Sequence, residues 1–203
     1  MDVTGIIIRS ADYGEKDRII TIASPEGIFS VKAKGVRSPK SKLKAFTGVL
    51  SFGEFTLINT KAGYTLSGAN IEESFYNCWS DPDKYTAAMA CLEIYEKCAE
   101  RGDNVSVVSL LKALKNINYG EFYPLAETLR YGTCCAAETG IDVTEGVFPG
   151  KICDVFSALI KCDSVEEVLT EYEKEDVNTF LRHLAAGFRS ELGIKLTVCA
   201  RLS

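Results

Sequence analysis

Residues 28–55 read IFSVKAKGVRSPKSKLKAFTGVLSFGEF, and they decide the fold of the first part of the chain. Polar and apolar side chains alternate over residues 28–34, which predicts a strand with Lys32 and Lys34 on one face. A glycine, a serine and a proline then interrupt the alternation, which predicts a loop. The stretch ends in a second predicted strand, residues 49–58.

This stretch concentrates positive charge. Between residues 28 and 53 there are six basic residues and no acidic one, although the whole chain has a net charge of -5. Grouped like charges repel one another and destabilise the compact state, so the cluster indicates a polyanionic partner. A cationic strand face that continues into a loop suits a sugar-phosphate backbone. The predicted DNA contacts are Lys32, Lys34, Arg37, Lys40, Lys42 and Lys44, with Arg9, Lys16 and Arg18 as weaker additions.

The flanking sequence completes a small barrel. Further strands are predicted at residues 3–10, 18–24 and 64–71, and a Ser-Pro-Glu-Gly turn joins the strand that ends at residue 24 to the basic one. Gly53 predicts a bulge or bend within its strand. Five short strands with glycine at the corners favour a Greek-key barrel of the OB type, and an SH3-like barrel is the alternative.

The hydrophobic period changes near residue 80. Asp81 followed by Pro82 is a helix start, with the aspartate as N-cap and proline at the first helical position. Ser164 and Glu167 form a capping-box pattern further along, and Gly193 ends the last helical pattern. Helices are predicted at residues 82–99, 107–117, 122–139, 154–161, 165–172 and 177–192, with residues 141–150 irregular. The sequence therefore predicts an OB-fold domain over residues 1–80 and an all-α domain over residues 81–203.

Charge also divides the chain at this point. Residues 1–80 hold 10 basic and 8 acidic side chains, a balance of +2, whereas residues 81–203 hold 13 and 20, a balance of -7. This asymmetry predicts different partners for the two domains. No run approaches the roughly 18 apolar residues of a membrane span. The first residues do not form a signal peptide, so we expect no membrane association and a cytoplasmic location. The eight cysteines are then expected to be free thiols.

Three stretches together resemble the bacterial recombination mediator RecO family. They are DYGEKDRIIT at residues 12–21, AKGVRSPKSKLKAFTGVLSFGEFTL at 33–57 and YTLSGANIEESF at 64–75. The resemblance is close over residues 1–80. It continues more loosely through the helical part, including the ending FLRHLAAGFRSELGIKL at residues 180–196.

The resemblance implies more than the residues do. It implies an OB domain followed by a helical domain, binding to single- and double-stranded DNA, and annealing of complementary strands. It also implies partnership with RecR and with the acidic tail of single-strand-binding protein. Together these proteins load RecA recombinase onto single strands during repair.

Zinc is the point at which the sequence departs from this family. Many members carry a zinc-binding insert with two C-x-x-C pairs in the helical domain. The corresponding region here, residues 130–161, holds adjacent Cys134 and Cys135, followed by Cys153 and then Cys162 just beyond it. Adjacent cysteines do not readily share one metal ion with unstrained geometry. We therefore expect a metal-free version of the domain without a cofactor.

No set of residues predicts catalysis. Asp12, Glu15 and Asp17 cluster in a turn with basic residues interleaved, which favours a structural salt bridge over acid or metal chemistry. The single histidine, His183, lies beside an apolar helix stripe and is interpreted as structural. No nucleophile, base and oxyanion donor occur together, so the chain is not expected to be an enzyme.

Two further groups of residues are open to interpretation. Tyr13, Phe29 and Tyr64 could stack on bases beside the cations, although aromatic residues at such positions more often pack in the core. A groove in the acidic helical domain could bind the acidic partner tail if it combines apolar walls with a cation. The candidate cations for that groove are Arg130, Arg182 and Arg189.

Two rival functions remain open at this level. An OB barrel can bind RNA as well as DNA. Alternatively, the basic loop could grip an acidic protein, which would make the chain an adaptor without nucleic acid. Cations scattered over unrelated surfaces, or neutralised by carboxylates, would contradict the nucleic-acid interpretation.

Overall fold

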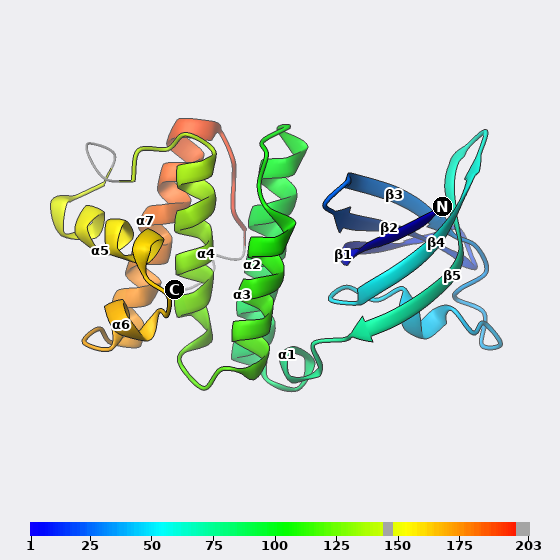
Figure 1. Ribbon diagram of the computed structural model, residues 1–203, viewed down its shortest axis with the longest axis horizontal. Coiled ribbons are helices and arrows are strands. Elements are labelled where there is room, and N and C mark those ends of the chain that lie inside the picture. Colours follow the sequence, from blue (N-terminus) through cyan, green and yellow to red (C-terminus); the bar gives the residue numbers. More distant parts are fainter. Residues whose placement is uncertain (144–147, 198–203) are drawn as a thin grey trace. The chain divides into compact units, whose positions relative to one another are not determined.

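A computed structural model describes residues 1–143 and 148–197 of the chain (Figure 1). The chain divides into two compact units, Met1–Phe75 and Tyr76–Ser203. The sequence had placed the boundary a few residues later, after residue 80. The difference arises because a short helix, α1 (Tyr76–Ser80), was not apparent in the hydrophobic pattern and opens the second unit.

The first unit is a closed five-stranded barrel in the order β1-β2-β3-β5-β4. Its strands are β1 (Asp2–Tyr13), β2 (Asp17–Ser24), β3 (Gly27–Ala33), β4 (Phe52–Thr60) and β5 (Gly63–Glu73). All neighbouring strands pair antiparallel except β3 and β5, which pair in parallel. This closed Greek-key arrangement confirms the OB-type prediction over the SH3-like alternative.

Alternation along the strands separates the barrel core from its surface. On β3, Val31 and Ala33 are fully buried whereas Lys32 is half-buried on the opposite face. Val31 is opposite Ile20 of β2, which is also fully buried, and Phe55 of β4 joins the same core. Because successive strand side chains point to opposite faces, this burial pattern sets which lysines reach the surface.

The connection from β3 to β4 differs from the prediction. Strand β4 begins at Phe52 rather than at Val49, and a short 3-10 helix, η1 (Lys44–Phe46), precedes it. Leu50 has a φ of +63°, which a leucine does not adopt in a strand. Its backbone N–H donates to the carbonyl of Ile7, so the segment closes onto β1 instead of extending β4. We call residues 34–51 the basic loop.

Gly53 meets the prediction of a bulge. The register between β4 and β5 shifts between Phe52 and Gly53. A Cβ atom at Gly53 would lie 2.1 Å from the carbonyl oxygen of Asn70, so only glycine permits this close approach of the two backbones.

The second unit is helical and is built around one central helix. Helix α4 packs against α2, α3, α5 and α7 (Figure 1). Gly132 on α4 makes this close packing possible, because a Cβ atom there would lie 2.7 Å from Leu184 Cδ2 and 3.1 Å from Ile94 Cδ1. The helices are α2 (Pro82–Glu100), α3 (Val107–Tyr119), α4 (Pro124–Glu138), α5 (Gly150–Lys161), α6 (Glu166–Leu169) and α7 (Lys174–Leu192).

Two of the predicted helix ends are confirmed. The Asp81 carboxylate accepts hydrogen bonds from the backbone N–H groups of Asp83 and Lys84, so it caps α2 as expected. Gly193 adopts the left-handed conformation, with a φ of +68°, and ends α7. The local sequence was sufficient to predict these helix ends, because the hydrogen bonds of a cap are made within one turn of the helix.

The predicted capping box at Ser164 and Glu167 is wrong. Val165 is the N-cap residue of α6, and the Ser164 hydroxyl accepts instead from the backbone N–H of Glu166. A capping box does occur, but at the start of α7, where Glu173 is the N-cap. An acidic N-cap can accept the same backbone bond as serine, so the Ser-x-x-Glu pattern alone does not locate the motif.

Helix α5 begins at Gly150, earlier than the predicted residue 154. Part of the predicted irregular segment, residues 144–147, lies outside the described residues, as does Cys199. Within the described part of the chain, no helix combines the length and apolarity needed to cross a bilayer.

Candidate nucleic-acid interface

The basic loop is tied at its start to the turn between β1 and β2. The backbone N–H of Arg37 donates to the Lys16 carbonyl at 2.9 Å, and the Arg37 guanidinium donates to the Gly14 carbonyl at 2.9 Å. The backbone N–H of Gly35 donates to the Asp17 carboxylate at 2.8 Å. These three bonds join residues far apart in the sequence and hold the loop against one end of the barrel.

The far end of the loop is also attached to the barrel. The Ser10 hydroxyl of β1 donates to the Thr47 carbonyl at 2.7 Å. The Thr47 hydroxyl in turn donates to the carbonyl of Lys44, the first residue of η1. Attachment at both ends gives the lysines between them a defined backbone to project from.

Three of the predicted DNA contacts form ion pairs. Asp12 pairs with Arg18 at 3.0 Å and with Arg37 at 3.2 Å. Asp17 pairs with Lys32 at 3.0 Å. Both aspartates therefore form salt bridges, as the sequence predicted. Among the described residues, neither belongs to a group of side chains that could hold a metal ion.

Asp17 is the more strongly held of the two carboxylates. The backbone N–H of Gly35, followed by the Lys32 ammonium, keeps the pKa of Asp17 below its ordinary value of 3.8. A carboxylate that accepts a backbone N–H and a lysine favours its charged form. Asp17 thereby links β2, β3 and the start of the basic loop.

Five further predicted contacts are lysines that do not take part in these ion pairs. They are exposed, and within residues 1–143 and 148–197 none of them pairs with a carboxylate. These side chains are Lys16, Lys34, Lys40, Lys42 and Lys44, which we call the free lysines. Arg9 is exposed on β1, next to the register shift between Ile7 and Arg9. Carboxylates therefore hold some of the predicted cations, and others are exposed.

Of the three candidate aromatic platforms, only Tyr13 is largely exposed. Its side chain is 54% exposed, and the Lys32 ammonium lies 4.7 Å from the centre of its ring. Phe29 and Tyr64 instead meet edge to face at 5.6 Å and pack against the barrel core. Of the three predicted stacking residues, Tyr13 is therefore the one most open to solvent, and it lies beside a predicted cation.

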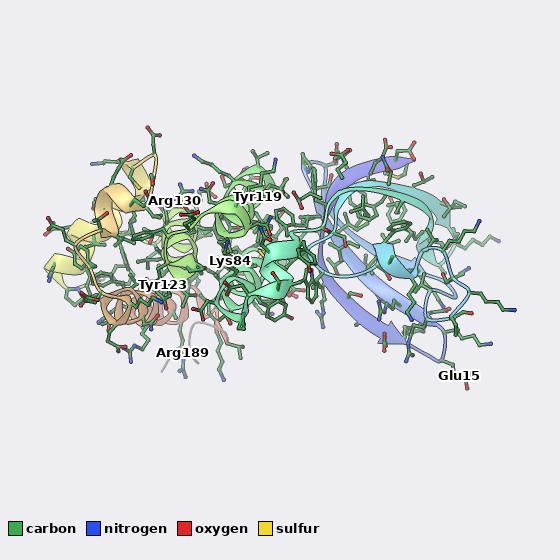
Figure 2. All side chains as sticks on the ribbon, turned by 90° about the horizontal axis from the view of Figure 1, so that it is seen from below. Glu15, Lys84, Tyr119, Tyr123, Arg130 and Arg189 are labelled. Carbon is green, nitrogen blue, oxygen red and sulfur yellow. The ribbon has the colours of Figure 1, made fainter. Side chains whose placement is uncertain are left out.

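The candidate cations of the helical unit also differ in burial and in ion pairing. Arg130 is buried and pairs with Glu127 at 3.2 Å, so it is not open to a partner. Arg182 pairs with Glu175 at 3.0 Å but remains exposed. Arg189 is exposed on α7 and points away from the helical unit (Figure 2).

Arg182 and Arg189 contribute to one cavity, which we call the α7 cavity. It has a volume of about 310 Å³, and cations and small or apolar side chains line it together. The lining residues are Arg182, Ala185, Ala186, Arg189, Lys195 and Leu196. Sequence reasoning missed Lys195, because it follows the glycine that ends α7 and belongs to no periodic pattern.

A second cavity of the helical unit was also not anticipated. It has a volume of about 480 Å³ and lies between α3, the start of α4 and the residues before α6. Its walls include Tyr119, Phe122 and Tyr123, and its edge carries both lysines and acids. The aromatic residues at positions 119–123 were the sequence signal that could have indicated this cavity.

The cysteines of the described residues bear on the prediction of a metal-free domain. In the part of the chain that the structure describes, no three histidine, cysteine or acidic residues are placed to hold a metal ion. Cys135 and Cys153 are buried, and Cys134 and Cys162 are half-buried. Burial raises the pKa of the thiols of Cys134, Cys135 and Cys162, which opposes the thiolate form that zinc requires. His183 is half-buried on α7, consistent with the structural role expected for it.

The fold and the candidate interface define a class of protein. It has an OB-type barrel with a clamped basic loop, followed by a helical unit. Comparison with known proteins then shows what the barrel unit is similar to. Residues 1–75 match the family described as "Recombination protein O N terminal". These residues are the whole barrel unit. The barrel unit is therefore similar to the N-terminal domain of the RecO family, which is the resemblance that the motifs indicated.

Individual relatives agree with this assignment. The "DNA repair protein RecO" of Acetivibrio thermocellus is 41% identical over 95 residues, which is 46% of this chain and 38% of the relative. The protein of the same name from Desulfitobacterium hafniense is 38% identical over 92 residues, 45% of this chain and 34% of the relative. That of Clostridium perfringens is 34% identical over 93 residues, 45% and 38% respectively. Each match thus spans well under half of the relative's length.

Proposed function

We propose that this protein is a DNA-binding recombination mediator that acts in DNA repair without being an enzyme. It anneals complementary strands and helps to load a recombinase onto single-stranded DNA. The observation that supports the proposal is the set of free lysines: four lie on the basic loop, which is clamped to an OB-type barrel, and Lys16 lies in the β1–β2 turn that the loop contacts. The family match of the barrel supports the choice of DNA repair.

The mechanism follows from the charge of the loop. The free lysines would neutralise backbone phosphates and release their counterions, which drives binding without base specificity. Two DNA strands held at such a surface repel each other less, so complementary bases can meet. Tyr13 would provide one stacking platform beside the loop, since base stacking tolerates any sequence.

The decisive experiment reverses the charge of the loop. The triple variant Lys40→Glu, Lys42→Glu, Lys44→Glu should weaken single-stranded DNA binding by about 100-fold or more, and it should abolish strand annealing. A matched control reverses three exposed lysines of the helical unit, Lys112, Lys115 and Lys161, with the same change in net charge. Fluorescence anisotropy measures binding, and circular dichroism checks that the barrel remains folded. A folded loop variant that binds DNA as the control does would refute the assignment.

Salt dependence gives an independent measure of the same contacts. If four to six phosphates are contacted, the logarithm of the single-strand affinity should fall with the logarithm of salt concentration at a slope of about -3 to -4. An affinity that does not change with salt would remove the electrostatic explanation.

The two rival functions are separated by simple binding tests. Competition between DNA and RNA oligomers of matched sequence distinguishes a DNA-binding protein from an RNA-binding module. No shift of any nucleic acid at low salt would favour the adaptor role.

For the helical unit we propose a partner-binding role at the α7 cavity. A peptide that carries acidic residues and ends in an apolar residue fits a cavity where Arg189 and Lys195 lie beside Ala185 and Leu196. The acidic tail of single-strand-binding protein has this chemistry. Partnership with a RecR-like protein rests on the family relation alone.

This role is tested with the full chain and a labelled peptide of the tail. Arg189→Glu should weaken peptide binding by at least about tenfold, because it removes a cation and adds a like charge. Lys151→Glu, a change of the same size at an exposed position on α5, serves as the control. Equal binding by the two variants would place the tail elsewhere.

The proposal also includes the absence of zinc. The spacing of the four cysteines and the raised thiol pKa values of three of them support it. Elemental analysis of the purified chain should find less than one zinc per molecule, and a stoichiometric amount would overturn this part.

A further inference from the structure

Asp12 holds two arginines at once. Its Oδ1 atom lies 3.0 Å from Arg18 Nε, and its Oδ2 atom lies 3.2 Å from Arg37 Nη2. Each carboxylate oxygen therefore lies beside a different guanidinium, one on β2 and one in the basic loop. Both arginines were candidates for DNA contact from the sequence.

This ion-paired set faces solvent. The side chain of Asp12 is 52% exposed, and those of Arg18 and Arg37 are 28% and 35% exposed. A phosphate group could reach the same guanidinium donors, because phosphate and carboxylate oxygens accept from arginine in the same geometry. The carboxylate thus occupies the place that a backbone phosphate would take.

We propose that Asp12 limits the affinity of the interface by withholding Arg18 and Arg37 from the nucleic-acid backbone. This inference rests on the proposed function, since it concerns the same surface. Asp12 acts as an internal competitor that leaves the free lysines as the main contacts. Moderate affinity suits a protein that must release the strands after they have paired.

Both guanidiniums have other anchors that would remain without Asp12. Arg37 also donates to the carbonyl of Gly14, and Arg18 Nη1 lies 3.4 Å from the Thr47 hydroxyl. Removing the carboxylate therefore leaves two arginines still positioned at the barrel end, with donors open to a phosphate. The expected effect is a gain of binding, which a purely structural role would not produce.

Asp17 provides the contrast within the same cluster. Its side chain is only 26% exposed, and it accepts from the backbone of Gly35 as well as from Lys32. Loss of that carboxylate would release the start of the basic loop. Asp17→Asn should therefore weaken DNA binding, whereas Asp12→Asn should strengthen it.

Glu15 offers a matched control. It lies in the same turn and is exposed, and Figure 2 shows its side chain at the outer end of the barrel unit, pointing away from it. Within the described residues it forms no ion pair. Glu15→Gln and Asp12→Asn each remove one negative charge from the same region, so they change the long-range attraction of DNA equally. Only Asp12→Asn frees two arginines.

The test compares these variants in the full chain, with a labelled oligothymidylate of about 20 nucleotides, longer than one OB-fold site. Glu15→Gln should tighten binding by no more than about twofold. Asp12→Asn should tighten it by about tenfold at low salt and steepen the salt slope by up to about 1.4, the value for two added phosphate contacts. Adding Arg37→Gln to Asp12→Asn should remove much of the gain.

Each alternative outcome is informative. Equal affinities for Asp12→Asn and Glu15→Gln would overturn the inference while leaving the proposed function intact. Weaker binding by a folded Asp12→Asn variant would show that Asp12 only positions the loop, and it would also overturn the inference. Absence of binding by both the wild-type chain and Asp12→Asn would overturn the proposed function and the inference together.

Discussion

The two units of this chain distribute charge and thiols in opposite ways. The barrel unit contains no cysteine and concentrates its cations in the basic loop, whereas all eight cysteines and a net charge of -7 lie in the second unit. In the barrel, the core fixes which side chains reach the surface, and the surface carries the chemistry. In the helical unit, the reactive groups are mostly buried. The comparison teaches that binding to DNA and binding to a protein partner are expected on different units.

The largest effect should come from a substitution in the barrel core. Its consequences are measured in both units, by DNA binding and by cysteine alkylation. Phe55 is fully buried, and Phe55→Ala should destabilise the barrel by about 3–5 kcal/mol and reduce DNA binding. Burial raises the pKa of the Cys98 thiol to about 12, so this thiol should resist alkylation at pH 8 while the helical unit is folded. Mass mapping of alkylated peptides should find Cys98 still protected in Phe55→Ala. Rapid labelling of Cys98 in this variant would show that the units do not fold independently.

A smaller effect should be confined to the helical unit. Asp81→Ala removes the N-cap of α2 and should lower the stability of this unit by about 1 kcal/mol. Urea unfolding followed by cysteine labelling measures it, since every cysteine lies in this unit. Ser80→Ala, one residue earlier, is the control and should change stability much less. Altered DNA binding by Asp81→Ala would contradict the assignment of DNA binding to the barrel unit alone.

The smallest effect concerns acid stability of the barrel. Because the folded pKa of Asp17 lies below 3.8, its contribution to stability is fully present above that value and is lost as the pH falls through the folded pKa. Between pH 5 and strongly acidic solution, the wild-type barrel should therefore lose more stability than Asp17→Asn. Thermal unfolding at a series of pH values measures the difference. If the stability of the two proteins fell equally with pH, the pKa of Asp17 would not be lower in the folded state than in the unfolded chain.

Most of the fold could be predicted from local sequence. Alternation placed all five strands, and the helical period placed six of the described helices, α2 to α7, because burial of one face imposes these periods. The errors fell where a distant contact overrides the local pattern. Val49 begins the predicted strand, yet Leu50 adopts a positive φ and bonds to Ile7 of β1. Helix α1 is too short to have a period of its own.

The candidate interface was predicted only in part. The run of cations between β3 and β4 is visible in sequence, and so is the nearby cluster of Asp12, Glu15 and Asp17. Which aspartate pairs with which cation is not, because Arg37 reaches Asp12 only when the loop folds back over the β1–β2 turn. The α7 cavity was likewise hidden, since Lys195 follows the end of the helix that carries Arg189.

The sequence by itself determined the order of elements, the change from strands to helices and the accumulation of positive charge in one segment, because each depends on neighbours along the chain. Only the tertiary structure decided which of those charges are exposed and which are held by carboxylates. The reason is physical: an ion pair depends on distances of a few ångströms between side chains on different strands, and closure of the barrel sets those distances.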